Sequence, residues 1–128
     1  MSKSPESNAD DSADRLTTVL NAVTEALLRG TADPFIPLFS DDIVWDGLHS
    51  WQHCQGKETV LGFFNRGFFS EPRRIDHLDA HQEGDSVVLK ATGPDFYEVT
   101  REGERIPRES RGLTFTFTGD QVTYLKGG

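Results

Sequence analysis

Large apolar residues alternate strictly with threonine from Leu113 to Thr118, where the chain reads LTFTFT. Successive side chains of a β-strand point to opposite faces, so this pattern predicts a strand with one buried face and one exposed face. Gly119-Asp120 then suits a tight hairpin turn, and residues 122–125 are predicted to return as the last strand. The chain is therefore expected to end in a half-buried antiparallel hairpin.

The first half of the chain carries helical patterns instead. A first helix is predicted by apolar residues at helical spacing, with Ser12 or Asp11 as its cap and Gly30 just past its end. Asp33-Pro34 predicts a short second helix, because aspartate caps well and proline suits the first helical position. The apolar residues of the first helix are Leu16, Val19, Leu20, Val23 and Leu27.

A third helix is predicted after Gly56, in the run GKETVLGFFNRGFF, and it should end before Pro72. A strand is predicted at residues 43–45, and further strands follow the third helix. Helices first and antiparallel strands afterwards indicate an α+β domain. Three N-terminal helices packed on a curved antiparallel or mixed sheet would give a cone-shaped fold that encloses a pocket. Before the closing hairpin, the later strands are predicted at residues 73–81, 86–92 and 96–100.

Length and charge limit the class of protein. The 128 residues fit one domain, with residues 1–11 expected to be a flexible acidic tail and residues 12–128 the folded domain. The formal net charge of −8 disfavours binding to nucleic acid or to an anionic membrane surface. The single cysteine excludes an internal disulfide, and no apolar run resembles a signal peptide or a membrane span. We therefore expect a cytoplasmic protein without a nucleic-acid or membrane partner.

Three motifs and the order of the predicted elements resemble the nuclear transport factor 2-like superfamily. The motifs are FSDDIVWDG, QGKETVLGFFNRGF and GLTFTFTGDQVTYLKG. The superfamily includes ketosteroid isomerases, SnoaL-like polyketide cyclases and limonene epoxide hydrolases, and the resemblance covers nearly everything after the tail. It implies the cone-shaped fold and a homodimer formed through the outer face of the sheet. In this chain the row Thr114, Thr116 and Thr118 would supply that face.

The resemblance does not extend to the catalytic residues of ketosteroid isomerases. Counted back from Gly56, the position of their general base falls on Gly47, and their oxyanion-binding positions fall near Val23 and Leu113. Asp46 lies one residue before the base position, so on a regular strand it would face away from the cavity unless a bulge turned it. The isomerase mechanism is therefore not expected here.

The segment DIVWDGLHSWQHC, residues 42–54, gathers side chains that could transfer protons. Asp46, His49 and His53 are candidate acids or bases, and Tyr97 on a later strand could donate a hydrogen bond to a ligand carbonyl. The histidines and the cysteine could also hold a metal, but their spacing matches no strong zinc motif, so no metal or other cofactor is predicted. Ordinary surface or core positions are the alternative for all of these side chains.

The pocket wall is expected to be aromatic, because the chain has nine phenylalanines and two tryptophans. Arg111 shares the strand parity of the inward-facing apolar row, so it could enter the cavity and bind a carboxylate, or pair with Asp46. The residues expected to line the pocket are Trp45, Trp51, Phe64, Arg111 and Phe115.

Two functions remain open on this sequence. One is an isomerase, cyclase or hydrolase that acts on a small apolar substrate by acid–base chemistry. The other is a non-catalytic module for ligand binding or dimerisation, in which the same groups only orient a ligand. In either case the predicted partner is a small, largely apolar molecule. Convergence of Asp46 and the histidines inside the cavity would favour catalysis, whereas their dispersal to solvent would favour binding.

Overall fold

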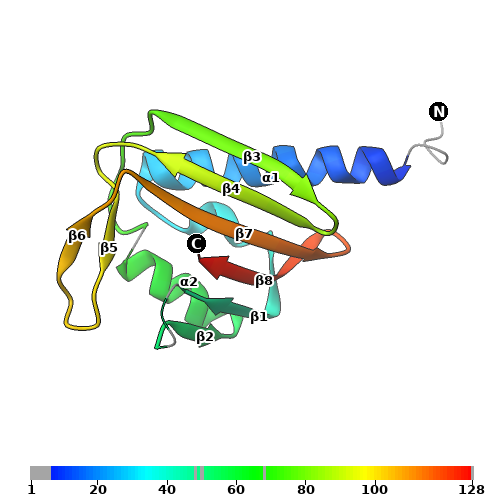
Figure 1. The fold of residues 1–128 in the computed structure, drawn as a ribbon. Coiled ribbons are helices and arrows are strands. Elements are labelled where there is room, and N and C mark those ends of the chain that lie inside the picture. The colour runs from blue at the N-terminus through cyan, green and yellow to red at the C-terminus, as the bar shows by residue number, and fades with distance from the viewer. Residues whose placement is uncertain (1–6, 48, 50, 68, 128) are drawn as a thin grey trace.

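The computed structural model describes residues 7–47, 49, 51–67 and 69–127. Six strands form a main sheet in the order β2-β1-β8-β7-β4-β3, and β5 and β6 form a separate hairpin (Figure 1). β1 and β8 run parallel and the other neighbours run antiparallel, so the main sheet is mixed. The helices are α1 (Ser7–Arg29), η2 (Asp33–Phe35) and α2 (Lys57–Arg66). The strands are β1 (Phe39–Asp46), β2 (His53–Gln55), β3 (His77–Glu83), β4 (Ser86–Thr92), β5 (Tyr97–Val99), β6 (Arg105–Pro107), β7 (Ser110–Thr118) and β8 (Gln121–Gly127).

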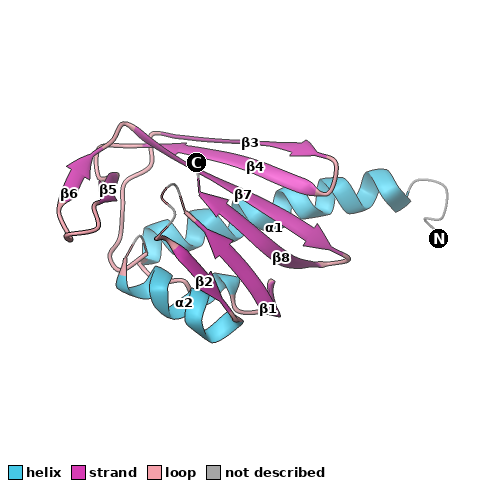
Figure 2. Ribbon diagram, turned by 60° about the horizontal axis from the view of Figure 1, so that its bottom comes forward, coloured by secondary structure: helices cyan, strands magenta, loops and turns pink. Residues whose placement is uncertain are grey.

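Both α-helices pack on the concave side of the curved main sheet, α1 against β3 and β4 and α2 against β1 and β2 (Figure 2). α1 begins at Ser7, so residues 7–11 are helical although we expected them to belong to a tail; residues 1–6 lie outside the described residues. α1 ends at Arg29. The N–H of the next residue, Gly30, donates to the carbonyl of Ala26 (2.8 Å), and its positive φ of 73° suits glycine. The buried residues of its apolar face are Val19, Ala22, Val23, Ala26 and Leu27.

The prediction of three N-terminal helices is wrong in number, because the described residues contain two α-helices. The segment after Asp33 forms only one 3₁₀ turn, η2. Two features prevent a longer helix here. Pro37 lacks the N–H that a longer helix would need, and strand β1 already begins at Phe39. The buried side chains of Phe35 and Phe39 nevertheless face inward as expected.

The closing hairpin is confirmed. In β7 the side chains of Phe115 and Phe117 are buried, whereas Thr114 and Thr116 between them remain partly exposed and Thr118 is exposed. Strands β7 and β8 pair antiparallel across a turn that contains Gly119. The alternation that the sequence carries therefore separates an inner and an outer face of the sheet.

Phenylalanine rings form the centre of the core. The ring of Phe35 stacks on that of Phe39 at 5.2 Å between centroids, meets Phe69 edge-on at 5.3 Å, and lies 6.0 Å from Phe115. All four side chains are at most 1% exposed. Aromatic pairs of this geometry add to the stabilisation that comes from burial alone. No helix in the described part of the chain is long and apolar enough to cross a membrane.

Candidate ligand-binding site

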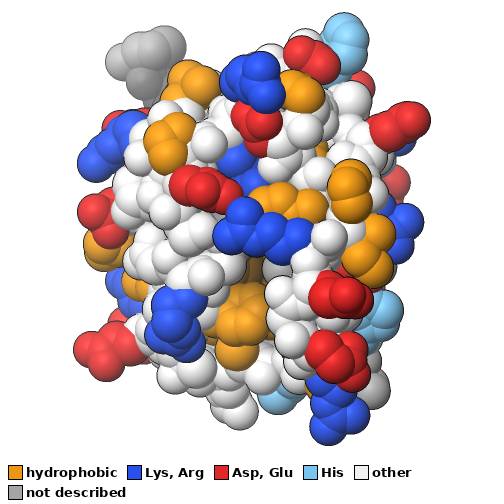
Figure 3. All heavy atoms as spheres, turned by 90° about the vertical axis from the view of Figure 1, so that its left-hand side faces the viewer, with side chains coloured by type: hydrophobic (Ala, Val, Ile, Leu, Met, Phe, Trp, Pro, Cys, Tyr) orange, Lys and Arg blue, Asp and Glu red, His pale blue; other side chains and the backbone are white. Residues whose placement is uncertain are grey.

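A pocket opens between the two α-helices and the inner face of the sheet. The space among its lining residues, counted together with the part that opens to solvent, is about 800 Å³. Seen from the side of the β5–β6 hairpin, hydrophobic side chains lie in a hollow of the surface with Lys or Arg side chains beside it (Figure 3). The lining residues are Val23, Leu27, Trp45, Gln52, Phe63, Phe64, Gly67, Phe69, Leu89, Ala91, Tyr97, Arg111, Gly112, Leu113 and Gly127.

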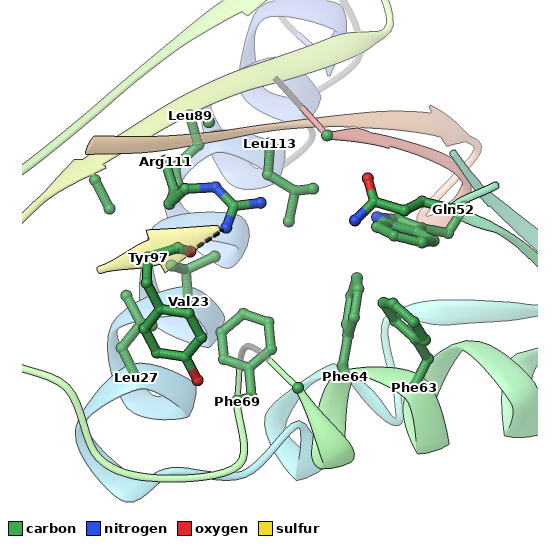
Figure 4. Close-up of a pocket in the computed structure, with 15 residues that line it drawn as sticks. Val23, Leu27, Gln52, Phe63, Phe64, Phe69, Leu89, Tyr97, Arg111 and Leu113 are labelled. Atoms are coloured by element: carbon green, nitrogen blue, oxygen red, sulfur yellow. Dashed lines mark hydrogen bonds between the residues drawn. The ribbon is translucent and has the colours of Figure 1, made fainter. Parts of the chain in front are cut away.

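Arg111 brings a cation into this largely apolar wall. It lies on β7 with the inward parity of Leu113, and its guanidinium reaches toward the cavity (Figure 4). Its Nη1 donates to the backbone carbonyl of Tyr97 at 2.5 Å, which fixes the side chain against β5. Burial lowers the pKa of Arg111, while the nearby carboxylate of Glu98 acts in the opposite direction. The pocket therefore holds a partly desolvated positive charge.

Tyr97 lines the pocket from β5, and two other arginines hold its side chain. Its hydroxyl oxygen accepts a hydrogen bond from Nη2 of Arg73 (2.6 Å), which is only 2% exposed. The guanidinium groups of Arg73 and Arg105 lie 4.3 and 4.5 Å from the centroid of its ring. Arg73 also donates to the carbonyl of Asp95 (2.6 Å), so the segment before β5 is tied to the loop that follows α2. These contacts fix the position of the Tyr97 side chain.

Gln52, which lies between β1 and β2 in the chain, enters the pocket opposite Arg111 (Figure 4). Its backbone carbonyl oxygen accepts a hydrogen bond from the backbone N–H of Gly47 (2.7 Å). Its side-chain Oε1 accepts one from the backbone N–H of His49 (3.1 Å). Both bonds fix the amide relative to the end of β1. The pocket thus has Gln52 on one side and Arg111 with Tyr97 on the other, and apolar side chains lie between them.

A carboxylate outside the pocket lining joins the segment after β1 to the β5–β6 hairpin. Glu98 on β5 is 5% exposed, and its Oε2 lies 2.5 Å from Nε2 of His49, while Oε1 accepts hydrogen bonds from Nε (2.9 Å) and Nη2 of Arg108. The hydrogen bonds from His49 and from Arg108 hold the pKa of Glu98 below its usual range. The β1–β2 connection and the β5–β6 hairpin are therefore linked through a charged contact.

Comparison with known proteins decides the family. A family profile described as SnoaL-like domain matches residues 20–125, which is most of the chain. The chain belongs to the SnoaL-like domain family. This family lies within the nuclear transport factor 2-like superfamily, as the sequence motifs indicated. No curated protein sequence matches the chain.

Solved structures share the fold of this SnoaL-like domain at low sequence identity. A nuclear transport factor 2-like protein from Anabaena variabilis has a TM-score of 0.68 at 17% identity, over 100% of this chain and 92% of that protein. A candidate polyketide cyclase from Pseudomonas putida has a TM-score of 0.65 at 18% identity, over 89% and 90%. A candidate SnoaL-like polyketide cyclase from Jannaschia sp. has a TM-score of 0.61 at 22% identity, over 100% and 90%. At these identities the similarity concerns the fold.

Two of the proposed acid–base residues lie together, but not in the pocket wall of the SnoaL-like domain. Asp46 Oδ1 is 2.6 Å from Nδ1 of His53, and Asp46 Oδ2 accepts a hydrogen bond from the hydroxyl of Tyr124 (2.8 Å). The bond from His53 and then that from Tyr124 lower the pKa of Asp46, and the same carboxylate raises the pKa of Tyr124. Trp45 lines the pocket, so its neighbour Asp46 points to the opposite face of β1.

The structure places some of the other predicted residues in the pocket lining and the rest outside it, on the surface or in the core. Trp45, Phe64, Tyr97 and Arg111 line the pocket, and Trp45 packs its ring on those of Phe63 and Phe64. Trp51 does not line it: the ring is stacked on His49 at 6.0 Å, and the residue is 38% exposed. Phe115 does not line it either, because it is fully buried against Phe35 in the core.

The described residues hold no group of three or more histidine, cysteine or acidic side chains that could bind a metal ion. Cys54 lies on β2, and burial raises the pKa of its thiol, while the charge of Arg66 acts in the opposite direction. A raised thiol pKa leaves less thiolate at neutral pH, so this cysteine has the character of a packed side chain rather than a nucleophile.

Proposed function

We propose that this SnoaL-like domain binds a small, largely apolar molecule that carries a carboxylate, and that Arg111 holds the carboxylate. The observation that carries the proposal is a guanidinium in a wall otherwise made mainly of aromatic and aliphatic side chains. A cation away from water attracts an anion more strongly than a solvated one does. A guanidinium also offers paired N–H donors that match the two oxygens of a carboxylate.

The placement of titratable groups supports binding over acid–base catalysis. Among the described residues that line the pocket, the side chains that titrate are Tyr97 and Arg111. A general base has to come within about 2.6–3.2 Å of the proton that it removes, directly or through one water. Asp46 and His53 are engaged with each other outside the lining, and the imidazole of His49 is engaged with Glu98.

An isomerase, cyclase or hydrolase is the second candidate. It is supported by the fold similarity to two candidate polyketide cyclases and by His49, whose backbone N–H contacts the lining residue Gln52. The two candidates differ in one measurement. If a bound ligand is converted by the wild-type protein and a His49→Gln variant binds it without converting it, the enzyme is favoured.

Replacing Arg111 with glutamine is expected to weaken carboxylate binding roughly tenfold to a hundredfold, because a hydrogen bond to a charged group contributes about 1.5–3 kcal/mol. Isothermal titration calorimetry with benzoate, cyclohexanecarboxylate and 2-naphthoate, each compared with its neutral amide, measures this. Wild-type protein should prefer the acid, and Arg111→Gln should lose the preference.

The matched control is Arg101→Gln, which removes the same charge from an exposed position outside the pocket lining. It should bind the acids as the wild type does. If both variants lose the same affinity for the acids, Arg111 acts only through the net charge of the protein. If wild-type protein binds none of the acids, the proposal fails.

We also propose a homodimer formed through the outer face of the main sheet. Thr116 lies in the middle of this face, with its hydroxyl 2.8 Å from that of Ser86 on β4. Identical uncharged rows can meet across a twofold axis, whereas two lysines there would repel each other. We expect sedimentation to give twice the 14.3 kDa chain mass for wild-type protein and for a Thr17→Lys control on exposed α1, and the monomer mass for Thr116→Lys. A wild-type monomer at high concentration would contradict this.

A further inference from the structure

The amide of Gln52 has a defined orientation in the pocket. The backbone N–H of His49 donates to one of its two terminal atoms at 3.1 Å, and since a backbone N–H only donates, that atom is the oxygen. The NH₂ group is then the other atom, and it lies on the cavity side (Figure 4). It makes no hydrogen bond to another described residue. Gln52 therefore presents two N–H donors to whatever fills the pocket.

Gly47 provides the space that this amide occupies. A Cβ atom at position 47 would lie 2.4 Å from Oε1 and 2.7 Å from Cβ of Gln52, and 2.8 Å from the ring of Trp45. All three distances are shorter than non-bonded carbon contacts allow, so a side chain at 47 and the observed Gln52 conformation exclude each other. The side chain of Gln52 thus occupies the place that a side chain at position 47 would otherwise reach.

The polar side chains of the described wall are few and lie at separate places. They are Trp45, whose indole carries one N–H donor, and Gln52, Tyr97 and Arg111. The guanidinium of Arg111 and the NH₂ group of Gln52 can only donate hydrogen bonds, and the hydroxyl of Tyr97 already accepts one from Arg73. A ligand that matches this wall supplies acceptor oxygens rather than donors. Between Arg111 and Gln52 the wall is apolar, with Phe64, Phe63 and Leu113 facing the cavity (Figure 4).

We infer that the ligand is a cyclic keto acid, with its carboxylate on Arg111, its ketone oxygen on the amide of Gln52 and its apolar ring between them. Gln52 is then the residue that selects for the ketone. The inference rests on the function proposed above, because Arg111 must first hold the carboxylate. A ligand with an alkyl group in place of the ketone leaves the two N–H donors covered and without a hydrogen bond, which is unfavourable.

The test compares two ligands of nearly equal shape, 6-acetyl-2-naphthoate and 6-isopropyl-2-naphthoate, by isothermal titration calorimetry. Wild-type protein should bind the acetyl compound roughly five- to tenfold more tightly, the effect of one hydrogen bond to a neutral group. Gln52→Leu should bind both equally. Gln52→Glu should prefer the isopropyl compound, because a carboxylate oxygen repels a ketone oxygen. This ordered change of preference would not follow from a merely structural role of Gln52.

A second variant keeps the inference open to disproof if Gln52→Leu does not fold. Gly47→Ala should displace the amide and remove the preference while leaving Arg111 in place. Equal binding of both compounds by wild-type protein, or a preference that survives in Gln52→Leu or Gly47→Ala, would overturn the inference. Carboxylate binding that still depends on Arg111 would then leave the proposed function intact. Failure of wild-type protein to bind either acid would overturn both.

Discussion

Replacing Phe35 with alanine is expected to lower the free energy of unfolding by about 3–5 kcal/mol, the usual cost of removing a buried aromatic ring. The ring is fully buried and contacts three other phenylalanine rings, at 5.2 Å from Phe39, 5.3 Å from Phe69 and 6.0 Å from Phe115. These partners come from β1, from the loop after α2 and from β7, so the cavity would lie where three parts of the chain meet. Urea denaturation followed by circular dichroism measures the change.

Ile36 provides the control for this experiment. It is the next residue in the chain and also apolar, but it is 45% exposed. Ile36→Ala should change the free energy of unfolding by less than about 0.5 kcal/mol, as is usual for surface positions. If the two variants are equally stable, the aromatic cluster is not the centre of the core.

Periodicity in the sequence was sufficient to predict most of the fold. The alternation at 113–118 and the apolar stripe from Leu16 to Leu27 both report burial on one face, and the structure has a strand and a helix there. The same reasoning overestimated the helical length of the segment after Asp33. Its cap and proline signals are real, but helix formation also requires length, and the chain turns into β1 too soon.

Strand parity predicted which side chains face inward, but not where the pocket ends and the core begins. Arg111 and Leu113 on β7 line the pocket, whereas Phe115, two residues further along the same face, is fully buried in the core. The difference depends on what covers each position: at Phe115 it is the ring of Phe35, from a distant segment. A single strand carries no information about that contact.

Gln52 was missed for a different reason. It lies between β1 and β2 in a segment without periodicity, so no strand or helix rule assigns its direction. The signal that could have found it is Gly47. By motif spacing, Gly47 falls where ketosteroid isomerases have their general base; a glycine there leaves space that a nearby residue has to fill. Identifying that residue required the relative positions of Gly47, His49 and Gln52, which are linked by hydrogen bonds of Gly47 and His49 to Gln52.

Replacing Gly30 with alanine is expected to destabilise the domain by about 2–5 kcal/mol, through two separate causes. The φ of Gly30 is +73°, which costs an alanine about 1 kcal/mol or more. A Cβ there would also lie 2.5 Å from the backbone nitrogen of Pro72 and 2.6 Å from the carbonyl carbon of Glu71. Backbone atoms cannot move aside as a side-chain end can, so the overpacking adds a further cost of about 1–3 kcal/mol.

Gly84 separates the two causes. Its φ is +60°, but a Cβ there would meet no atom within 4 Å, so Gly84→Ala carries the conformational cost alone and should lose about 1 kcal/mol. The difference between the two variants in urea denaturation measures the close approach at Gly30. That approach matters for the pocket, because the N–H of Arg73 donates to the carbonyl of Leu27 (2.8 Å) and the guanidinium of Arg73 holds the hydroxyl of Tyr97. Gly30→Ala should therefore also weaken ligand binding, whereas Gly84→Ala should not. If the two variants lose equal stability, the close contact between the end of α1 and the loop that positions Tyr97 does not exist as described.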